Sequence, residues 1–141
     1  MRRVLLALLL LVVPAAAQVP ATDVPPGERA AIRGVIQGQM EAFRRDDGDA
    51  AFAFASPGIQ RIFGNPDNFM AMVRGGFQPV YRPRDVAFRE LLRLGDTLIQ
   101  PVEVIGPDGV AQLALYAMEQ QADGSWRIAG CELVAMPDRR V

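Results

Sequence analysis

The side chains able to do chemistry in this chain are carboxylates, arginines, two tyrosines and one thiol, because the sequence contains no histidine and a single cysteine. All 15 basic residues are arginine. Without imidazole there is no histidine general base and no histidine metal ligand. Without lysine there is no Schiff base, and one cysteine forms no disulfide within the chain. The acid–base chemistry that remains belongs to carboxylates and tyrosines.

Two glutamates in the strand-like second half are candidates for a general acid or base. Strict alternation places Glu90 on one face with valine, phenylalanine and leucine residues, and it places Glu132 on one face with Trp126 and Ile128. A carboxylate among apolar neighbours has a raised pKa and can exchange protons near neutral pH. The alternative is that both glutamates reach solvent or an arginine, which is the commoner position of an ionisable residue.

Tyr116 and Gln112 are the best candidates for a polar spot on a pocket wall. Alternation puts both on one strand face with Ala114 and Met118. Small residues beside a tyrosine and a glutamine leave room for a ligand whose polar end meets the hydroxyl and the amide. The alternative is a core tyrosine whose hydroxyl has a partner inside the protein.

A third candidate site is the segment Tyr81-Arg82-Pro83-Arg84, which carries two guanidinium groups. Arginine binds carboxylate or phosphate through two parallel hydrogen bonds, so Tyr81 and Arg82 could hold an anionic ligand at a pocket mouth. The alternative is that the prolines shape a connector and the arginines form surface ion pairs.

Two further features are interpreted as structural. Cys131 has no histidine to activate its thiol, so we expect a buried packing residue. The acidic cluster Asp46, Asp47 and Asp49 lacks the ligand spacing and closing glutamate of a calcium loop and is expected to cap a helix. We therefore expect neither a metal nor a cofactor.

The elements that would position these residues divide the chain into two halves. Apolar residues at helical spacing predict a helix over 28–45, shorter helices over 50–55 and 59–63, and a fourth that starts at Asn65 and Pro66. Positions 77–84 contain two prolines and are expected to be extended. Strand-like segments follow at 85–94, 97–105, 110–121 and 125–136, separated by short glycine-containing turns.

This order of elements predicts an α+β fold. We expect a curved antiparallel sheet, a four-stranded meander, wrapped around the N-terminal helices to give a cone with a central pocket. Pro101 interrupts the second strand and implies a bulge or an edge there.

The N-terminus has the pattern of a secretory signal peptide. Arg2 and Arg3 precede an apolar run, and small residues before Ala17 form a cleavage site. The run is about half the length of a membrane-spanning helix, so we expect cleavage and a periplasmic or secreted product with no stable membrane span, the alternative being a retained anchor. The predicted organisation is a signal peptide (1–17), a proline-rich leader (18–27), one domain (28–136) and a flexible tail (137–141). The near-zero net charge of −1 disfavours nucleic acid as a partner.

Three segments together identify a resemblance to a known family. They are Ala50 to Val73 with its paired phenylalanines and Asn65-Pro66, then Pro79-Val-Tyr-Arg-Pro83, and Gly124-Ser-Trp-Arg-Ile128 with the strand that continues to Leu133. They resemble a bacterial family of unknown function within the nuclear-transport-factor-two-like superfamily, which also contains ketosteroid isomerases, scytalone dehydratase and polyketide cyclases. The resemblance implies the cone fold and a homodimer formed through the sheet. It implies no activity, because this fold hosts enzymes and binding modules alike.

The functional expectation is an exported, non-catalytic module that binds a small apolar or anionic ligand, or a partner protein. Two alternatives are kept. One is an isomerase, dehydratase or hydrolase that works with a carboxylate and a tyrosine. The other is a structural homodimer whose pocket is closed.

Overall fold

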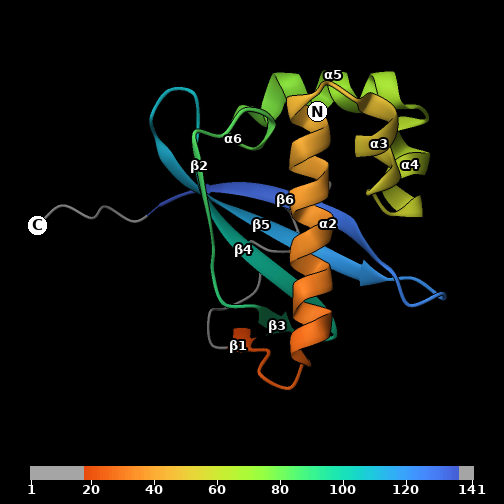
Figure 1. Cartoon of the computed structure of the whole chain (residues 1–141), viewed down its shortest axis with the longest axis vertical. Coiled ribbons are helices and arrows are strands. Elements are labelled where there is room, and N and C mark those ends of the chain that lie inside the picture. Colours follow the sequence, from red (N-terminus) through yellow and green to blue (C-terminus); the bar gives the residue numbers. More distant parts are fainter. Residues whose placement is uncertain (1–17, 137–141) are drawn as a thin grey trace, which may run out of the picture.

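The computed structural model describes residues 18–136, in which a group of helices precedes most of an antiparallel sheet (Figure 1). The α+β class is as predicted, while the predicted signal peptide and tail lie outside the described residues. The helices are α2 (Pro26–Arg44), α3 (Gly48–Ala53), α4 (Pro57–Phe63), α5 (Pro66–Gly76) and α6 (Gln78–Tyr81). The strands are β1 (Gln18–Pro20), β2 (Asp85–Phe88), β3 (Leu92–Leu94), β4 (Thr97–Ile105), β5 (Ala111–Gln120) and β6 (Trp126–Ala135).

The helix α2 lies across one face of the sheet, and α3, α4 and α5 gather beside its C-terminal end (Figure 1). Its apolar stripe of Ile32, Ile36, Met40 and Phe43 is buried, as the helical spacing predicts. Three shorter helices begin at side chains that accept a hydrogen bond from the first turn: Asp47 caps α3, Ser56 caps α4 and Asn65 caps α5. Within the described residues, no helix has both the length and the apolar character needed to cross a membrane.

Gly38 lets the segment after α3 approach α2 closely. A β-carbon built at Gly38 would lie 2.6 Å from the ring atom Cζ of Phe54, well inside van der Waals contact. Gly34, one turn earlier on the same helix, has nothing within 4 Å. Of the two glycines, only Gly38 therefore has a packing reason to lack a side chain.

The sheet is open, with strand order β1-β3-β4-β5-β6, and β2 also pairs with β4. The strands β4, β5 and β6 form an antiparallel meander close to the predicted bounds. The predicted strand over 85–94 is instead two strands, β2 and β3, which pair with different parts of β4.

Pro101 explains why the predicted strand divides. It lies in β4 between the part that pairs with β2 and the part that pairs with β3. The Pro101 carbonyl accepts a hydrogen bond from the backbone N–H of Arg89, in the connection between β2 and β3, at 3.0 Å. The ring nitrogen of Pro101, which has no hydrogen to donate, faces the same connection. The sequence correctly marked an interruption, but the interruption is in the neighbouring strand.

A second irregularity lies in β6 and changes which side chains share a face. The pairs Tyr116–Cys131 and Met118–Ile128 show that β6 has one more residue than β5 over this stretch, which is a β-bulge at Ala129 and Gly130. Side chains before the bulge therefore alternate out of step with those after it.

The segment 77–84 is not fully extended as predicted, because Gln78–Tyr81 form the single turn α6. Pro79 is in the first turn of this helix, where its missing N–H costs no helical hydrogen bond and its fixed φ suits the helix. The two prolines of the segment therefore do not exclude a helical turn at its start.

The core lies between the helices and one face of the sheet, called the inner face here. Its side chains include Leu98, Val102 and Val104 of β4, Ala114, Tyr116 and Met118 of β5, and Ile128 of β6. The opposite, outer face carries Pro101, Leu113, Leu115, Glu132 and Val134, and none of these belongs to the core cluster.

Candidate functional site

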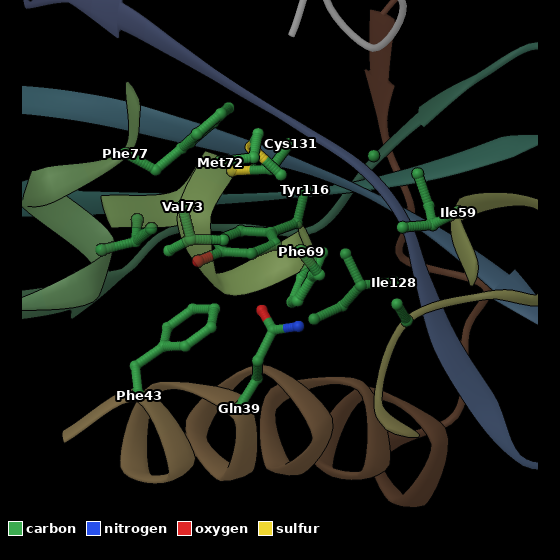
Figure 2. A pocket seen from close by; sticks show the side chains of 13 residues that line it. Gln39, Phe43, Ile59, Phe69, Met72, Val73, Phe77, Tyr116, Ile128 and Cys131 are labelled. Carbon is green, nitrogen blue, oxygen red and sulfur yellow. The ribbon is translucent and has the colours of Figure 1, made fainter. Parts of the chain in front are cut away.

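A cavity of about 40 Å³ lies between α2, the helices α5 and α6, and the inner face of β5 and β6 (Figure 2). Its wall is mainly apolar and contains three phenylalanines and a methionine. The lining residues are Gln39, Phe43, Ala55, Ile59, Phe69, Met72, Val73, Phe77, Val80, Tyr116, Ile128, Gly130 and Cys131.

The polar side-chain groups on this wall are the Tyr116 hydroxyl, the Gln39 amide and the Cys131 thiol. Tyr116 is 1% exposed, and the Cys131 thiol, a weak partner, is near its hydroxyl but forms no hydrogen bond of normal geometry with it, so that the hydroxyl is unsatisfied among the described residues. Gln39, also buried, donates from Nε2 to the backbone oxygen of Ala51 at 3.1 Å. Figure 2 shows Tyr116 and the Gln39 amide turned toward the same space between the sheet and α2.

Burial keeps both titratable groups of the cavity protonated at neutral pH. It raises the pKa of Tyr116 well above its usual value, and it raises the pKa of the Cys131 thiol to about 12. A thiol with this pKa is a poor nucleophile, which agrees with the interpretation of Cys131 as a packing residue.

The cavity is lined by buried residues apart from Met72 and Cys131, which keep partial solvent exposure. Its volume exceeds the ~10–15 Å³ that one water molecule needs, and it is far below the roughly 150 Å³ of a cavity that holds benzene. An organic ligand can therefore enter only if lining side chains move. Methionine and phenylalanine side chains are the movable part of this wall.

Tyr116 lies on the cavity wall, whereas Gln112 does not line it. Gln112 shares the inner face with Tyr116, as alternation predicts, but it sits near the far end of β5 opposite Val104 and Ala135. The structure therefore does not bring these two candidates together around one ligand.

Tyr81 and Arg82 contact the turn at the C-terminal end of α2, and neither lines the cavity. The Tyr81 hydroxyl donates to Asp46 Oδ1, and Arg82 Nη2 lies 3.0 Å from Asp46 Oδ2. Arg82 Nη1 also donates to the Phe43 backbone oxygen at 2.6 Å, and Arg74 Nη2 lies 3.9 Å from Asp46 Oδ1. These contacts agree with the ion-pair alternative for Arg82.

Asp46 is the non-glycine residue with a positive φ, 54°, in the described chain. The hydrogen bond from Tyr81 and the charges of Arg82 and Arg74 hold the pKa of its carboxyl below its usual value. The acidic cluster thus has two structural functions: Asp46 ties the end of α2 to α6, and Asp47 caps α3.

Strict alternation groups neither glutamate correctly with its neighbours, and the alternative of a solvent-exposed side chain agrees with Glu90. Glu90 is exposed and lies in the connection between β2 and β3, where the chain changes face. The bulge in β6 moves Glu132 to the outer face, opposite Leu115 of β5 and away from Trp126 and Ile128.

Glu132 is nevertheless 8% exposed, and its Oε1 has no partner among the described residues. Burial raises the pKa of this carboxyl above its usual value. Its environment is therefore unusual for a glutamate, although it is separated from the cavity by the sheet.

No carboxylate lines the cavity in the described part of the chain, so no acid meets Tyr116 there. Nor do residues 18–136 contain a group of three or more His, Cys, Asp or Glu side chains that could hold a metal ion. The sequence reasoning missed Gln39. Its position three residues after Ile36 on the apolar stripe of α2 was the available signal.

The model of a family described as a domain of unknown function (DUF4864) matches residues 26–141, which include the helices and all strands except β1. No curated protein and no solved structure matches the chain significantly.

Proposed function

The chain belongs to the family of this domain of unknown function (DUF4864), and from the geometry of its cavity we propose that it is a non-catalytic module that binds a small, neutral, largely apolar molecule. The observation that carries this proposal is the Tyr116 hydroxyl, buried on an apolar wall without a hydrogen-bond partner in the described residues. A buried polar group without a partner is costly, and a ligand carbonyl or hydroxyl would satisfy it.

The composition of the wall favours a neutral ligand over the anionic one that the sequence left open. No arginine lines the cavity in the described residues. A carboxylate placed there would lose its hydration and meet neutral donors without a compensating charge. A hydroxyl or carbonyl needs only the hydrogen bond that Tyr116 can make.

The size of the cavity indicates how the ligand enters. Met72 of α5 and Cys131 of β6 are the partly exposed lining residues, and Phe43, Phe69 and Phe77 are buried lining residues. Binding requires these side chains to rotate and give up part of their mutual packing. This cost favours a slim or flexible apolar molecule.

The test is a comparison of octan-1-ol with octanoate, followed through the amide chemical shifts of labelled protein. We expect octan-1-ol to shift amides around Tyr116 and Met72 and to bind more tightly than octanoate. Tyr116→Phe should weaken octan-1-ol binding several-fold. The matched control Tyr81→Phe, which removes a hydroxyl outside the cavity, should not. Equal or tighter binding of octanoate, or no binding of either at millimolar concentration, would refute the proposal.

The enzyme alternative has less support, because it needs a carboxylate beside Tyr116. A structural homodimer is the second candidate, and one observation favours it. Leu113, Leu115 and Val134 form an apolar row on the outer face, outside the core cluster. Light scattering after chromatography tests it: a dimer that Leu115→Glu converts to a monomer would support this candidate, and a monomeric parent chain would exclude it.

Two properties inferred from the sequence remain part of the proposal. The motifs of the nuclear-transport-factor-two-like superfamily, together with helices packed on a twisted antiparallel sheet, support membership of that superfamily. The charged start, apolar run and small residues before Ala17 support export to the periplasm or medium. Sequencing of the mature N-terminus should give Gln18, and a start at Met1 would contradict export by cleavage.

A further inference from the structure

The backbone edge of β6 from Cys131 to Ala135 borders the cavity only at Cys131, whose side chain lines it. β6 is the last strand of the sheet and pairs along one side with β5. Along its other side, hydrogen bonds cover only its start. The Ile128 N–H donates to the Phe54 oxygen at 2.9 Å, and the Ile128 oxygen accepts from the Ser56 N–H at 2.8 Å.

The register of β6 shows which backbone groups face this open side. Cys131 and Ile128 lie opposite Tyr116 and Met118 of β5, whose backbone groups form their hydrogen bonds with β4. The backbone N–H and C=O groups of Cys131 and Ile128 therefore point away from β5. The same holds for Leu133 and Ala135, two and four residues further along. Among residues 18–136, no hydrogen bond reaches the outward groups of these three residues. Within the described part of the chain, they form a row of donors and acceptors without partners.

Such an edge usually carries a device that prevents pairing, such as a proline, a charged side chain or a bulge. The stretch from Cys131 to Ala135 contains no proline, and its one charged residue is Glu132, whose carboxylate an added strand would have to neutralise. The bulge at Ala129 and Gly130 precedes it and leaves the strand regular from Cys131 onward. This stretch is therefore competent to accept an extended peptide as an added strand.

Glu132 gives an independent indication of what such a peptide contains. It lies in the middle of the free edge, it is 8% exposed, and its Oε1 has no partner among the described residues. The residue of an added strand opposite Glu132 would form a non-hydrogen-bonded pair, in which the α-carbons are about 4.5 Å apart and the side chains are close. A buried carboxylate is stabilised there by a cation that also donates a hydrogen bond.

Antiparallel edge-to-edge pairing of two copies through this stretch does not place a cation opposite Glu132. Antiparallel pairing of two β6 edges centred on Leu133 would place Val134 opposite Glu132. Pairing centred on Glu132 would oppose two carboxylates, and pairing centred on Cys131 would oppose Glu132 and Gly130. None of these three registers satisfies the carboxylate, which favours a segment of a different chain as the occupant.

We propose that the edge of β6 from Cys131 to Ala135 binds an extended segment of a partner protein, with an arginine or lysine opposite Glu132 and apolar residues on either side of that cation. The flanking residues would be opposite Cys131 and Leu133, whose side chains lie on the apolar inner face. This proposal does not depend on a ligand in the cavity.

The probe is a capped seven-residue peptide with the sequence serine-threonine-valine-arginine-valine-threonine-serine, titrated into labelled full-length protein. We expect the largest amide shifts at Cys131, Leu133 and Ala135. Replacing the arginine of the peptide by glutamate should weaken binding about tenfold or more, and N-methylation of its two valines should abolish binding. Glu132→Gln should bind the arginine and glutamate peptides with nearly equal affinity.

A backbone variant tests the edge itself. Ala135 is exposed and its N–H points away from β5, so Ala135→Pro removes an outward donor and no ladder hydrogen bond. We expect this variant to retain its fold and to bind the arginine peptide several-fold more weakly than the matched control Ala135→Ser. Unchanged binding by Ala135→Pro, equal binding of the N-methylated peptide, or no shift at millimolar peptide would overturn the proposal.

Discussion

Tyr116→Phe tests the feature on which the proposed function rests, because the substitution removes only the hydroxyl. An unpartnered buried hydroxyl costs ~1–3 kcal/mol of desolvation that no hydrogen bond offsets. Phenylalanine keeps the ring contacts and adds an oxygen-sized void. At ~24 cal/mol per Å³ and ~10–15 Å³ of void, this addition costs roughly 0.3 kcal/mol. The variant should therefore be more stable than the parent, by about 1 kcal/mol or somewhat more.

The assay is urea unfolding of the ligand-free protein, with the thermal midpoint as a second measurement. A gain of 1 kcal/mol corresponds to a rise of roughly 4 °C for a domain of this size. Tyr81→Phe is the control, since its hydroxyl donates to Asp46 and its loss should lower stability. A loss of about 1 kcal/mol in Tyr116→Phe would refute the reasoning, because it would show that the hydroxyl already has a partner in the free protein.

Three further predictions concern packing and charge. Gly34→Ala should stabilise α2 by ~0.5–1 kcal/mol. Gly38→Ala should be less stable than Gly34→Ala by ~1–3 kcal/mol, because its β-carbon meets the Phe54 ring. Chemical denaturation measures both free energies of unfolding, and Phe54→Ala should remove the difference. Glu132→Gln should raise the stability of the free protein at pH 7. Because the pKa of Glu132 is raised in the folded state, the stability of the parent falls as pH rises from the usual pKa of 4.5 through the folded pKa. Melting curves from pH 4 to 8 should not show this fall in the variant. Asp46→Asn should make acid unfolding less steep. Because the pKa of Asp46 is lowered in the folded state, its contribution to stability is complete above the usual pKa of 3.8 and is lost as pH falls through the folded pKa. An unchanged acid transition in the variant would contradict this.

The faces of the strands show the limit of reading a pattern along one strand. Alternation correctly grouped Tyr116 with Ala114 and Met118, because β5 is regular over this stretch on the side of β4. The same rule failed for Glu132, because one extra residue in β6 reverses every later side chain. The bulge is defined by pairing with β5, and the sequence of β6 does not display that pairing.

The candidate site shows a similar division. Tyr116 was identified as a candidate wall residue from the alternation of its strand, and it lies on the cavity wall. The partners of the Arg82 side chain could not be predicted, because Asp46 and Phe43 lie far away in the sequence. The packing of α6 against α2 brings them close to Arg82. Contacts of this kind depend on the tertiary arrangement and leave no periodic signal.

By itself the sequence determined the α+β class, helices before the meander, the caps of α3 and α5 and the approximate bounds of β4, β5 and β6, because each depends on neighbours within one or two turns or along one strand. It also limited the chemistry, since a chain without histidine or lysine has only carboxylates, tyrosines and a thiol for acid–base work. The tertiary structure decided that no carboxylate lines the cavity in residues 18–136, that the Tyr116 hydroxyl is left without a partner there, and that Glu132 is buried on the opposite face. These outcomes depend on strand register and on helix packing across the sheet, which arise from contacts between residues distant in the chain.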